Sequence, residues 1–84
     1  MKHICPVCGW PDLHEPPRNT EGAASFEICV SCGFEFGFDD DDAGLTYDAA
    51  RVRWVEGGMK WWSASCPAPA GWDPEEQLIR AGLV

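Results

Sequence analysis

Basic residues are scarce in this sequence. Six lysines and arginines stand against 14 aspartates and glutamates, which gives a formal net charge of −8. Residues 19–50 contain no lysine or arginine, and they hold eight acids: Glu21, Glu27, Glu35, Asp39, Asp40, Asp41, Asp42 and Asp48. Proteins that bind nucleic acid use Lys and Arg to displace the counterions of the phosphate backbone. The charge distribution therefore argues against nucleic-acid binding and favours a basic protein partner.

Long hydrophobic runs are also missing. No apolar stretch approaches the roughly 20 residues that a membrane-spanning helix needs, and the start of the chain, Met1 to Cys5, has no apolar segment typical of a signal peptide. We therefore expect no membrane association and a cytoplasmic location. A disordered tail is excluded, because the chain is 45% hydrophobic and has five Trp and four Phe.

Two short turns of the same form are the strongest signal in the sequence. They are Cys5-Pro-Val-Cys8-Gly9 and Cys29-Val-Ser-Cys32-Gly33, and 20 residues separate Cys8 from Cys29. A Cys-x2-Cys turn points both thiols to one side, and the following glycine tolerates a positive φ. Two such turns facing each other offer four thiolates to one ion. We predict one structural Zn²⁺ per chain, bound by Cys5, Cys8, Cys29 and Cys32.

Two other uses of these cysteines are open at this stage. Rubredoxin-like iron also uses paired Cys-x2-Cys-Gly turns, and it would make the protein an electron carrier. The short separation between the turns and the helical C-terminal part favour zinc. A secreted miniprotein with two disulfides is the other alternative, but in the cytoplasm paired cysteines are typical of metal ligands.

The rest of the pattern predicts a small α+β domain spanning residues 1–84. Residues 1–38 form a four-cysteine zinc ribbon with rubredoxin-like turns, 39–45 an acidic loop, and 46–84 a helical, tryptophan-rich extension packed on the ribbon. Residues 25–28 and 34–38 alternate polar and apolar side chains, which predicts a β-hairpin around the second turn. Phe26 and Ile28 are expected to pack near the phenylalanines at positions 34, 36 and 38.

Two helices are predicted in the C-terminal half. Thr46 is a plausible N-cap for an amphipathic helix over residues 47–56, with Tyr47, Ala50, Trp54 and Val55 on one face and Arg51 largely elsewhere. Gly57 and Gly58 would end it. The sequence Asp73-Pro74-Glu75-Glu76 supplies an N-cap, a first-turn proline and two acids, and so opens a short helix closing near Gly82.

Residues 25–40, with the sequence SFEICVSCGFEFGFDD, resemble the bacterial cysteine-rich CPCC-domain proteins. The resemblance extends over most of the chain through Glu15-Pro16-Pro17, Arg53, Trp54, Gly58, Lys60-Trp61-Trp62, Gly71-Trp72-Asp73-Pro74 and Gln77-Leu78. This chain departs from the family pattern at Val7, where the family has a further cysteine, and at Val30, where it often has proline. The resemblance implies a zinc-ribbon-like bacterial domain, in a family without a settled activity.

The other candidate residues have simpler interpretations. Cys66 has no partner base or cationic setting nearby, so we interpret it as an ordinary loop thiol. His3 and His14 flank the first turn, but four thiols already complete a tetrahedral site. The run Asp39–Asp42 lacks the bidentate acid of a calcium loop. No nucleophile and base are recognisable together, so the protein is not expected to be an enzyme.

These patterns lead to a hypothesis about function. Residues 35–42 would form an acidic face that engages a basic protein, with Tyr47 or an exposed tryptophan as an anchor. Four of the five tryptophans, at positions 54, 61, 62 and 72, lie in the C-terminal half. We expect them mainly to cover the metal site, because a cysteine turn offers few apolar atoms of its own.

Overall fold

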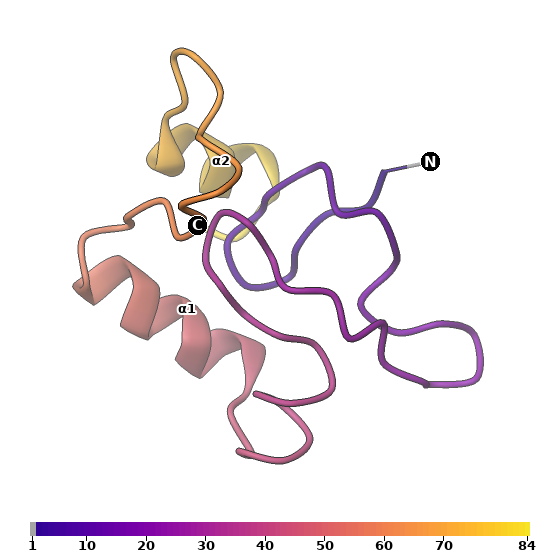
Figure 1. The fold of residues 1–84 in the computed structure, drawn as a ribbon. Coiled ribbons are helices and arrows are strands. Elements are labelled where there is room, and N and C mark those ends of the chain that lie inside the picture. The colour runs from indigo at the N-terminus through magenta and orange to yellow at the C-terminus, as the bar shows by residue number, and fades with distance from the viewer. Residues whose placement is uncertain (1) are drawn as a thin grey trace.

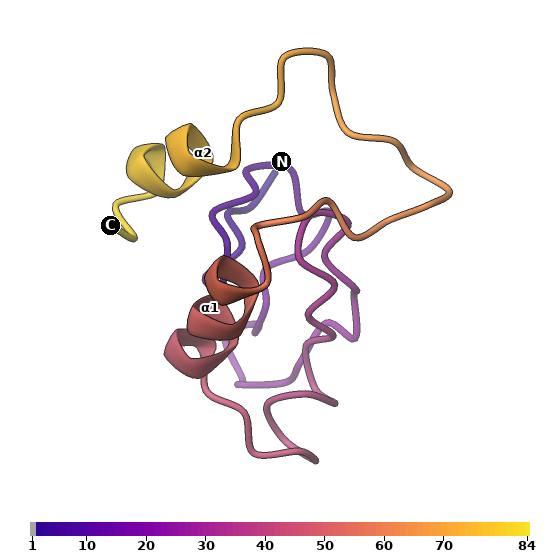
Figure 2. The ribbon, with the colours of Figure 1, turned by 90° about the vertical axis from the view of Figure 1, so that its left-hand side faces the viewer.

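Two short helices are the only regular secondary structure among residues 2–84, the part of the chain that the computed structural model describes. Helix α1 spans Tyr47–Glu56 and helix α2 spans Pro74–Arg80. The N-terminal half winds as irregular chain beside both helices (Figure 1). A long irregular connection joins α1 to α2 and swings outward before it returns (Figure 2). The half of the chain that carries the paired cysteines is therefore held by turns, not by a sheet.

Both helices begin where their caps predict. The Thr46 side chain accepts a hydrogen bond from the Ala49 amide, and the Asp73 side chain accepts from the amides of Glu75 and Glu76. Pro74 occupies the first turn of α2, where its missing N–H would be unsatisfied in any residue. The predicted span of residues 47–56 is confirmed, as is a short helix after Asp73.

The predicted β-hairpin, and with it the α+β class, is wrong. Residues 25–28 and 34–38 meet only through one isolated antiparallel bridge, between Ile28 and Glu35, and two more isolated bridges lie elsewhere in the N-terminal half. Beyond Glu35 the chain curls into turns: the Phe38 and Asp39 amides both donate to the Glu35 carbonyl. Phe38 is 52% exposed as a result.

The acidic residues explain why no strand returns along the second turn. Asp39 accepts a hydrogen bond from the Glu35 amide, and Asp40 accepts one from the Gly37 amide. Aspartate side chains that bond to nearby backbone N–H groups offer the chain an alternative to a ladder. Gly37 also has φ +101°, which a strand does not allow. The alternation of Phe34, Phe36 and Phe38 therefore does not mark a strand.

Helix α1 turns most of the predicted face inward, with two differences, at Val55 and Arg51. Ala50 is buried, and Tyr47 and Trp54 pack against the core as expected. Val55, however, is 40% exposed. Arg51 lies toward the first cysteine turn instead, where its guanidinium donates to backbone carbonyls. An arginine can pack its aliphatic stem and still satisfy its charge in this way.

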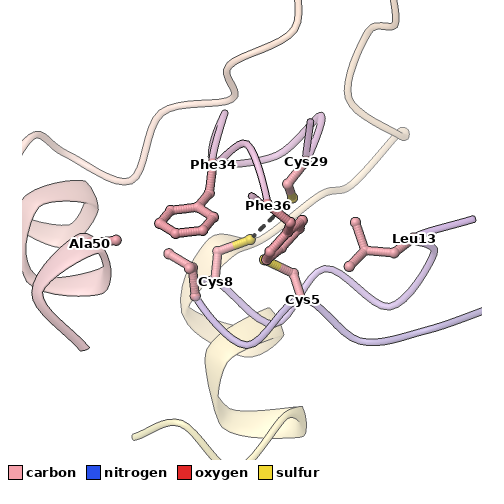
Figure 3. Packing of buried hydrophobic residues seen from close by; sticks show 8 residues of the cluster. Cys5, Cys8, Leu13, Cys29, Phe34, Phe36 and Ala50 are labelled. Atoms are coloured by element: carbon pink, nitrogen blue, oxygen red, sulfur yellow. Dashed lines mark hydrogen bonds between the residues drawn. The ribbon is translucent and has the colours of Figure 1, made fainter. Parts of the chain in front are cut away.

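The buried core is small and centres on the cysteines. It consists of Cys5, Val7, Cys8, Leu13, Cys29, Phe34, Phe36 and Ala50, with Leu78 buried separately. Figure 3 shows the rings of Phe34 and Phe36 beside the sulfurs, with Ala50 of α1 on one side and Leu13 on the other. The phenylalanines thus supply the apolar cover that the cysteine turns lack.

Most of the tryptophan rings pack against other side chains, and one is largely exposed. Trp61 meets both Trp10 and Trp72 edge to face, with ring centroids 5.1 Å apart in each pair. Trp54 packs against the core, whereas Trp62 is 54% exposed. Of the four C-terminal tryptophans expected to cover the cysteines, Trp54 alone is packed against the core, so that expectation holds only in part.

Neither helix in residues 2–84 has the length and apolar character that a membrane crossing requires.

Candidate metal centre

The two cysteine turns have the same backbone hydrogen bonds. In the first turn the Gly9 amide donates to the Cys5 carbonyl, and the Cys5 amide donates to the Trp10 carbonyl. In the second turn the equivalent bonds run from the Gly33 amide to Cys29 and from the Cys29 amide to Phe34. Gly9 and Gly33 have φ +87° and +81°, a region that L side chains rarely adopt. The repeated sequence motif therefore produces a repeated structure.

The turns face each other and bring four sulfurs together. The Sγ atoms of Cys5, Cys8, Cys29 and Cys32 all lie within 4.8 Å of one another. Cys5 Sγ and Cys32 Sγ are 3.9 Å apart. Cys8 Sγ and Cys29 Sγ are 3.7 Å apart, the contact dashed in Figure 3. Four sulfurs at about 2.3 Å from a tetrahedral zinc ion lie about 3.8 Å from each other. This cluster can therefore hold a tetrahedral metal ion.

The cluster is not a pair of disulfides. All five cysteines are free thiols in the structure, and a disulfide would bring two sulfurs to about 2.05 Å. Each of the two short sulfur–sulfur contacts also joins one turn to the other. The thiols are arranged around a common centre, as a metal site requires.

The four thiols compete for negative charge. Hydrogen bonds from the neighbouring thiols, chiefly Cys29, lower the pKa of Cys8, and the Ser31 hydroxyl adds to this effect. The same kind of contact, again led by Cys29, raises the pKa of Cys32, and burial raises it further. Four thiolates so close together repel one another unless a cation lies between them. Because a divalent ion neutralises that repulsion, the donor set suits a thiophilic metal.

The other candidate ligands lie outside the cluster. His3 pairs through its backbone with Leu13, and His14 is exposed, with its amide donating to Glu27. Cys66 is exposed and does not belong to the group of four sulfurs. Among residues 2–84 the structure brings together only the four paired cysteines as a possible metal site.

Helix α1 holds the first turn through Arg51. Its Nε donates to the Val7 carbonyl at 2.9 Å, and Nη2 donates to the Pro6 carbonyl at 2.7 Å. Nη1 pairs with Asp48 one helical turn earlier. These carbonyls lie between the two ligands Cys5 and Cys8, so Arg51 fixes the path of the chain that presents both sulfurs. Charged hydrogen bonds of this kind are stronger than neutral ones.

Helix α2 ties the two turns to each other through Gln77, which is buried. Its Nε2 donates to the Cys8 carbonyl at 3.0 Å and to the Ser31 hydroxyl at 3.1 Å. Its Oε1 accepts from the Trp72 indole at 2.8 Å. Ser31 is fully buried and in turn supports the Cys8 thiolate. Such contacts behind the ligands orient them for the metal.

The acidic residues after Phe38 have mixed roles. The carboxylates of Asp39 and Asp40 accept backbone hydrogen bonds within their own turn, and Asp40 also pairs with Arg18 at 3.0 Å. Burial alone would raise the pKa of Asp40, but hydrogen bonds from the Gly37 amide and Arg18 outweigh it and lower that pKa. Asp41, which also pairs with Arg18, and Asp42 are exposed. No calcium-like arrangement of oxygens appears among the described residues.

Comparison with known proteins identifies homologues without a known role. The chain is similar to the uncharacterized protein YozI of Bacillus subtilis (strain 168), with 36% identity over 69% of this chain and 60% of the relative. It is equally similar to the uncharacterized protein YoaQ of the same strain, with 36% identity over 68% of this chain and 60% of that protein. The chain thus spans about 60% of the length of the curated relatives it matches. No protein-family model matches, and no solved structure matches.

Proposed function

We propose that this protein is a zinc-stabilised interaction module of the cysteine-rich CPCC type, which engages a basic protein partner in the bacterial cytoplasm. The observation that carries the proposal is the cluster of four sulfurs within 4.8 Å. A site with four thiolate ligands has no open position at which water or substrate could be activated. The proposal therefore assigns the metal a structural role and assigns the domain no catalytic step.

A structural role for the metal is supported by how the site is built into the fold. Cys5, Cys8 and Cys29 are fully buried, and they make up a third of the buried apolar residues of the described chain. Arg51 and Gln77 then fasten both turns from behind. A metal so central to the core contributes directly to folding, as structural zinc does.

Metal analysis of protein purified without added metal tests this assignment. We expect about one zinc per chain and no visible absorbance, because Zn²⁺ has a filled d shell. About one iron per chain, with thiolate charge-transfer bands that bleach on reduction, would make the protein a rubredoxin-like electron carrier and overturn the proposal.

The basic partner is suggested by the acidic face, residues 35–42. Arg18 is the basic residue that reaches this face, and it pairs with Asp40 and Asp41. Asp42 is exposed, and Asp41 remains half exposed despite its ion pair. Exposed carboxylates of this kind steer a basic partner and set the salt dependence of binding.

A pair of conservative substitutions tests the acidic face. Asp41→Asn with Asp42→Asn removes two exposed charges and leaves the backbone contacts of Asp39 and Asp40 in place. We expect this variant to lose basic partners that the native protein retains at low salt and releases at high salt. The matched control, Glu21→Gln with Glu75→Gln, removes two exposed charges elsewhere. If both variants bind the same partner proteins, and if raising the salt concentration does not release them, the acidic face has no role in binding.

A further inference from the structure

A groove of about 410 Å³ lies between the first cysteine turn and α2. Trp10 and Pro11 line it from the first turn, and Pro69 and Trp72 line it from the segment before α2. This volume falls in the range of about 300–1,000 Å³ that is typical of ligand sites. Helix α2, which lines the groove, lies at the opposite end of the fold from residues 35–42 (Figures 1 and 2).

The aromatic walls of the groove are held in place from behind. Trp10 and Trp72 both pack edge to face against Trp61, with interplanar angles of 77°. The Trp72 indole N–H is also bound to Gln77, which reaches the Cys8 carbonyl. Two indole walls are therefore fixed before any ligand arrives, and pre-organised walls reduce the entropy lost on binding.

The charges around the groove are mainly negative. Three acids line it, Asp12, Asp73 and Glu76, against one base, Arg80. Asp73 caps α2, and Arg80 pairs with Glu76 while 78% of its side chain stays exposed. Asp12 is exposed, and no side chain in residues 2–84 forms an ion pair with it. A positively charged ligand would meet both indoles and this carboxylate.

We propose that the groove binds an arginine side chain of a basic partner protein. A guanidinium stacks on indole faces, is weakly hydrated and pairs with carboxylates through two parallel hydrogen bonds. The net negative lining opposes an anionic ligand. The inference rests on the proposed interaction role for the identity of the partner, but it places the contact on a different surface from residues 35–42.

NMR titration of the zinc-loaded, ¹⁵N-labelled protein tests the groove directly. The ligand is a capped Gly-Arg-Gly peptide, and its uncharged counterpart is capped Gly-Gln-Gly. We expect saturable shifts of the indole N–H signals of Trp10 and Trp72 with the arginine peptide only. Equal shifts with both peptides, or no saturable shift at these indoles, would overturn the inference. Shifts confined to the amides of Asp41 and Asp42 would overturn it too, while supporting the acidic face.

Substitutions at three exposed positions should change the affinity for the arginine peptide in different directions. Asp12→Asn should weaken binding of the arginine peptide roughly two- to fivefold, the range expected for a partly exposed charge pair. Arg80→Gln should strengthen it by a similar factor, because it removes a like charge and frees Glu76. Glu21→Gln, far from the groove, should leave binding unchanged. The proposed contact would be contradicted if the Asp12→Asn variant bound the arginine peptide as tightly as the Glu21→Gln variant does. Weaker binding of the peptide by the Arg80→Gln variant than by the native protein would also contradict it.

Discussion

Removing zinc with a chelator should unfold the chain almost completely. Among residues 2–84, the nine buried apolar residues include three of the four clustered cysteines, which leaves six others to hold the domain together. A core of that size does not offset the conformational entropy of the chain. Structural zinc sites contribute about 10–16 kcal/mol of binding free energy at neutral pH, which is comparable with the whole stability of a small domain. The metal-free protein is therefore expected to lose its tertiary structure.

Tryptophan fluorescence measures this loss, because four of the five indoles are partly buried and stack or pack in the folded protein. Their emission should shift to the red on chelation and return when zinc is added. Cys8→Ser should show the unfolded emission even with zinc present, whereas Cys66→Ser, the same change at an exposed thiol, should behave like the native protein. A blue emission that persists in excess chelator would show that the core stands without the metal.

Low pH should act in the same direction as the chelator. Thiolates must be deprotonated to bind the metal, so protons compete with zinc and the fold weakens as the pH falls. The pKa of Cys8 is already lowered by the neighbouring thiols, chiefly Cys29, and by Ser31, which favours its thiolate form. The dependence of unfolding on both pH and metal follows from one site placed at the centre of the core.

The parts of the structure that sequence could predict are those fixed by local chemistry. The two Cys-x2-Cys-Gly turns repeat the same backbone bonds wherever they occur, and the caps at Thr46 and Asp73 act within a few residues. Such signals depend on neighbours in sequence alone. The turns and both helix starts could therefore be predicted without any knowledge of the tertiary structure.

The hairpin was mispredicted because two local signals competed. Alternating phenylalanines indicate a strand, but Asp39 and Asp40 follow at the distance at which a carboxylate can bind the amides of Glu35 and Gly37. The sequence pattern predicts an acidic loop that begins only at residue 39, whereas the carboxylates of Asp39 and Asp40 also organise the turn before it. Few backbone bonds join the segments before and after the second turn, so the two cysteine turns meet at the cysteine cluster and not in a sheet.

The sequence does not reveal that Arg51 and Gln77 support the site, although Gln77 is one of the positions that carry the family resemblance. Arg51 and Gln77 lie 44 and 69 residues from the carbonyls of Val7 and Cys8 that they bind. On a helix diagram Arg51 belongs with the polar positions, and Gln77 is an ordinary polar residue of a short helix. Only the arrangement of α1 and α2 around the turns shows that each satisfies backbone groups next to a ligand.

Alanine at Gly9 should destabilise the zinc-bound protein more than alanine at Gly33. Both residues have a positive φ, +87° and +81°, and alanine in that region costs about 1–2 kcal/mol. A methyl group at Gly9 would lie 2.8 Å from the Gln77 carbonyl and 2.8 Å from Ala81 Cβ, so it would push on the backbone of α2. A methyl group at Gly33 would overlap the Trp62 ring down to its Cγ atom, so that side chain would have to rotate; since the ring is 54% exposed, this requires no shift of a helix backbone.

We expect Gly9→Ala to lower the free energy of unfolding by about 3 kcal/mol or more, and Gly33→Ala by about 1–2 kcal/mol. Denaturant unfolding at a fixed zinc concentration measures both. Gly22→Ala is the matched control, because Gly22 has φ +84° and no atom within 4 Å of the added carbon, and it reports the backbone effect alone. Equal losses at Gly9 and Gly22 would show that α2 does not press on the first turn. A loss of unfolding free energy in Gly9→Ala well above that in Gly22→Ala would establish that the packing of α2 on the first turn stabilises the metal centre. Displacing the helix would break the hydrogen bonds from Gln77 to the Cys8 carbonyl and the Ser31 hydroxyl.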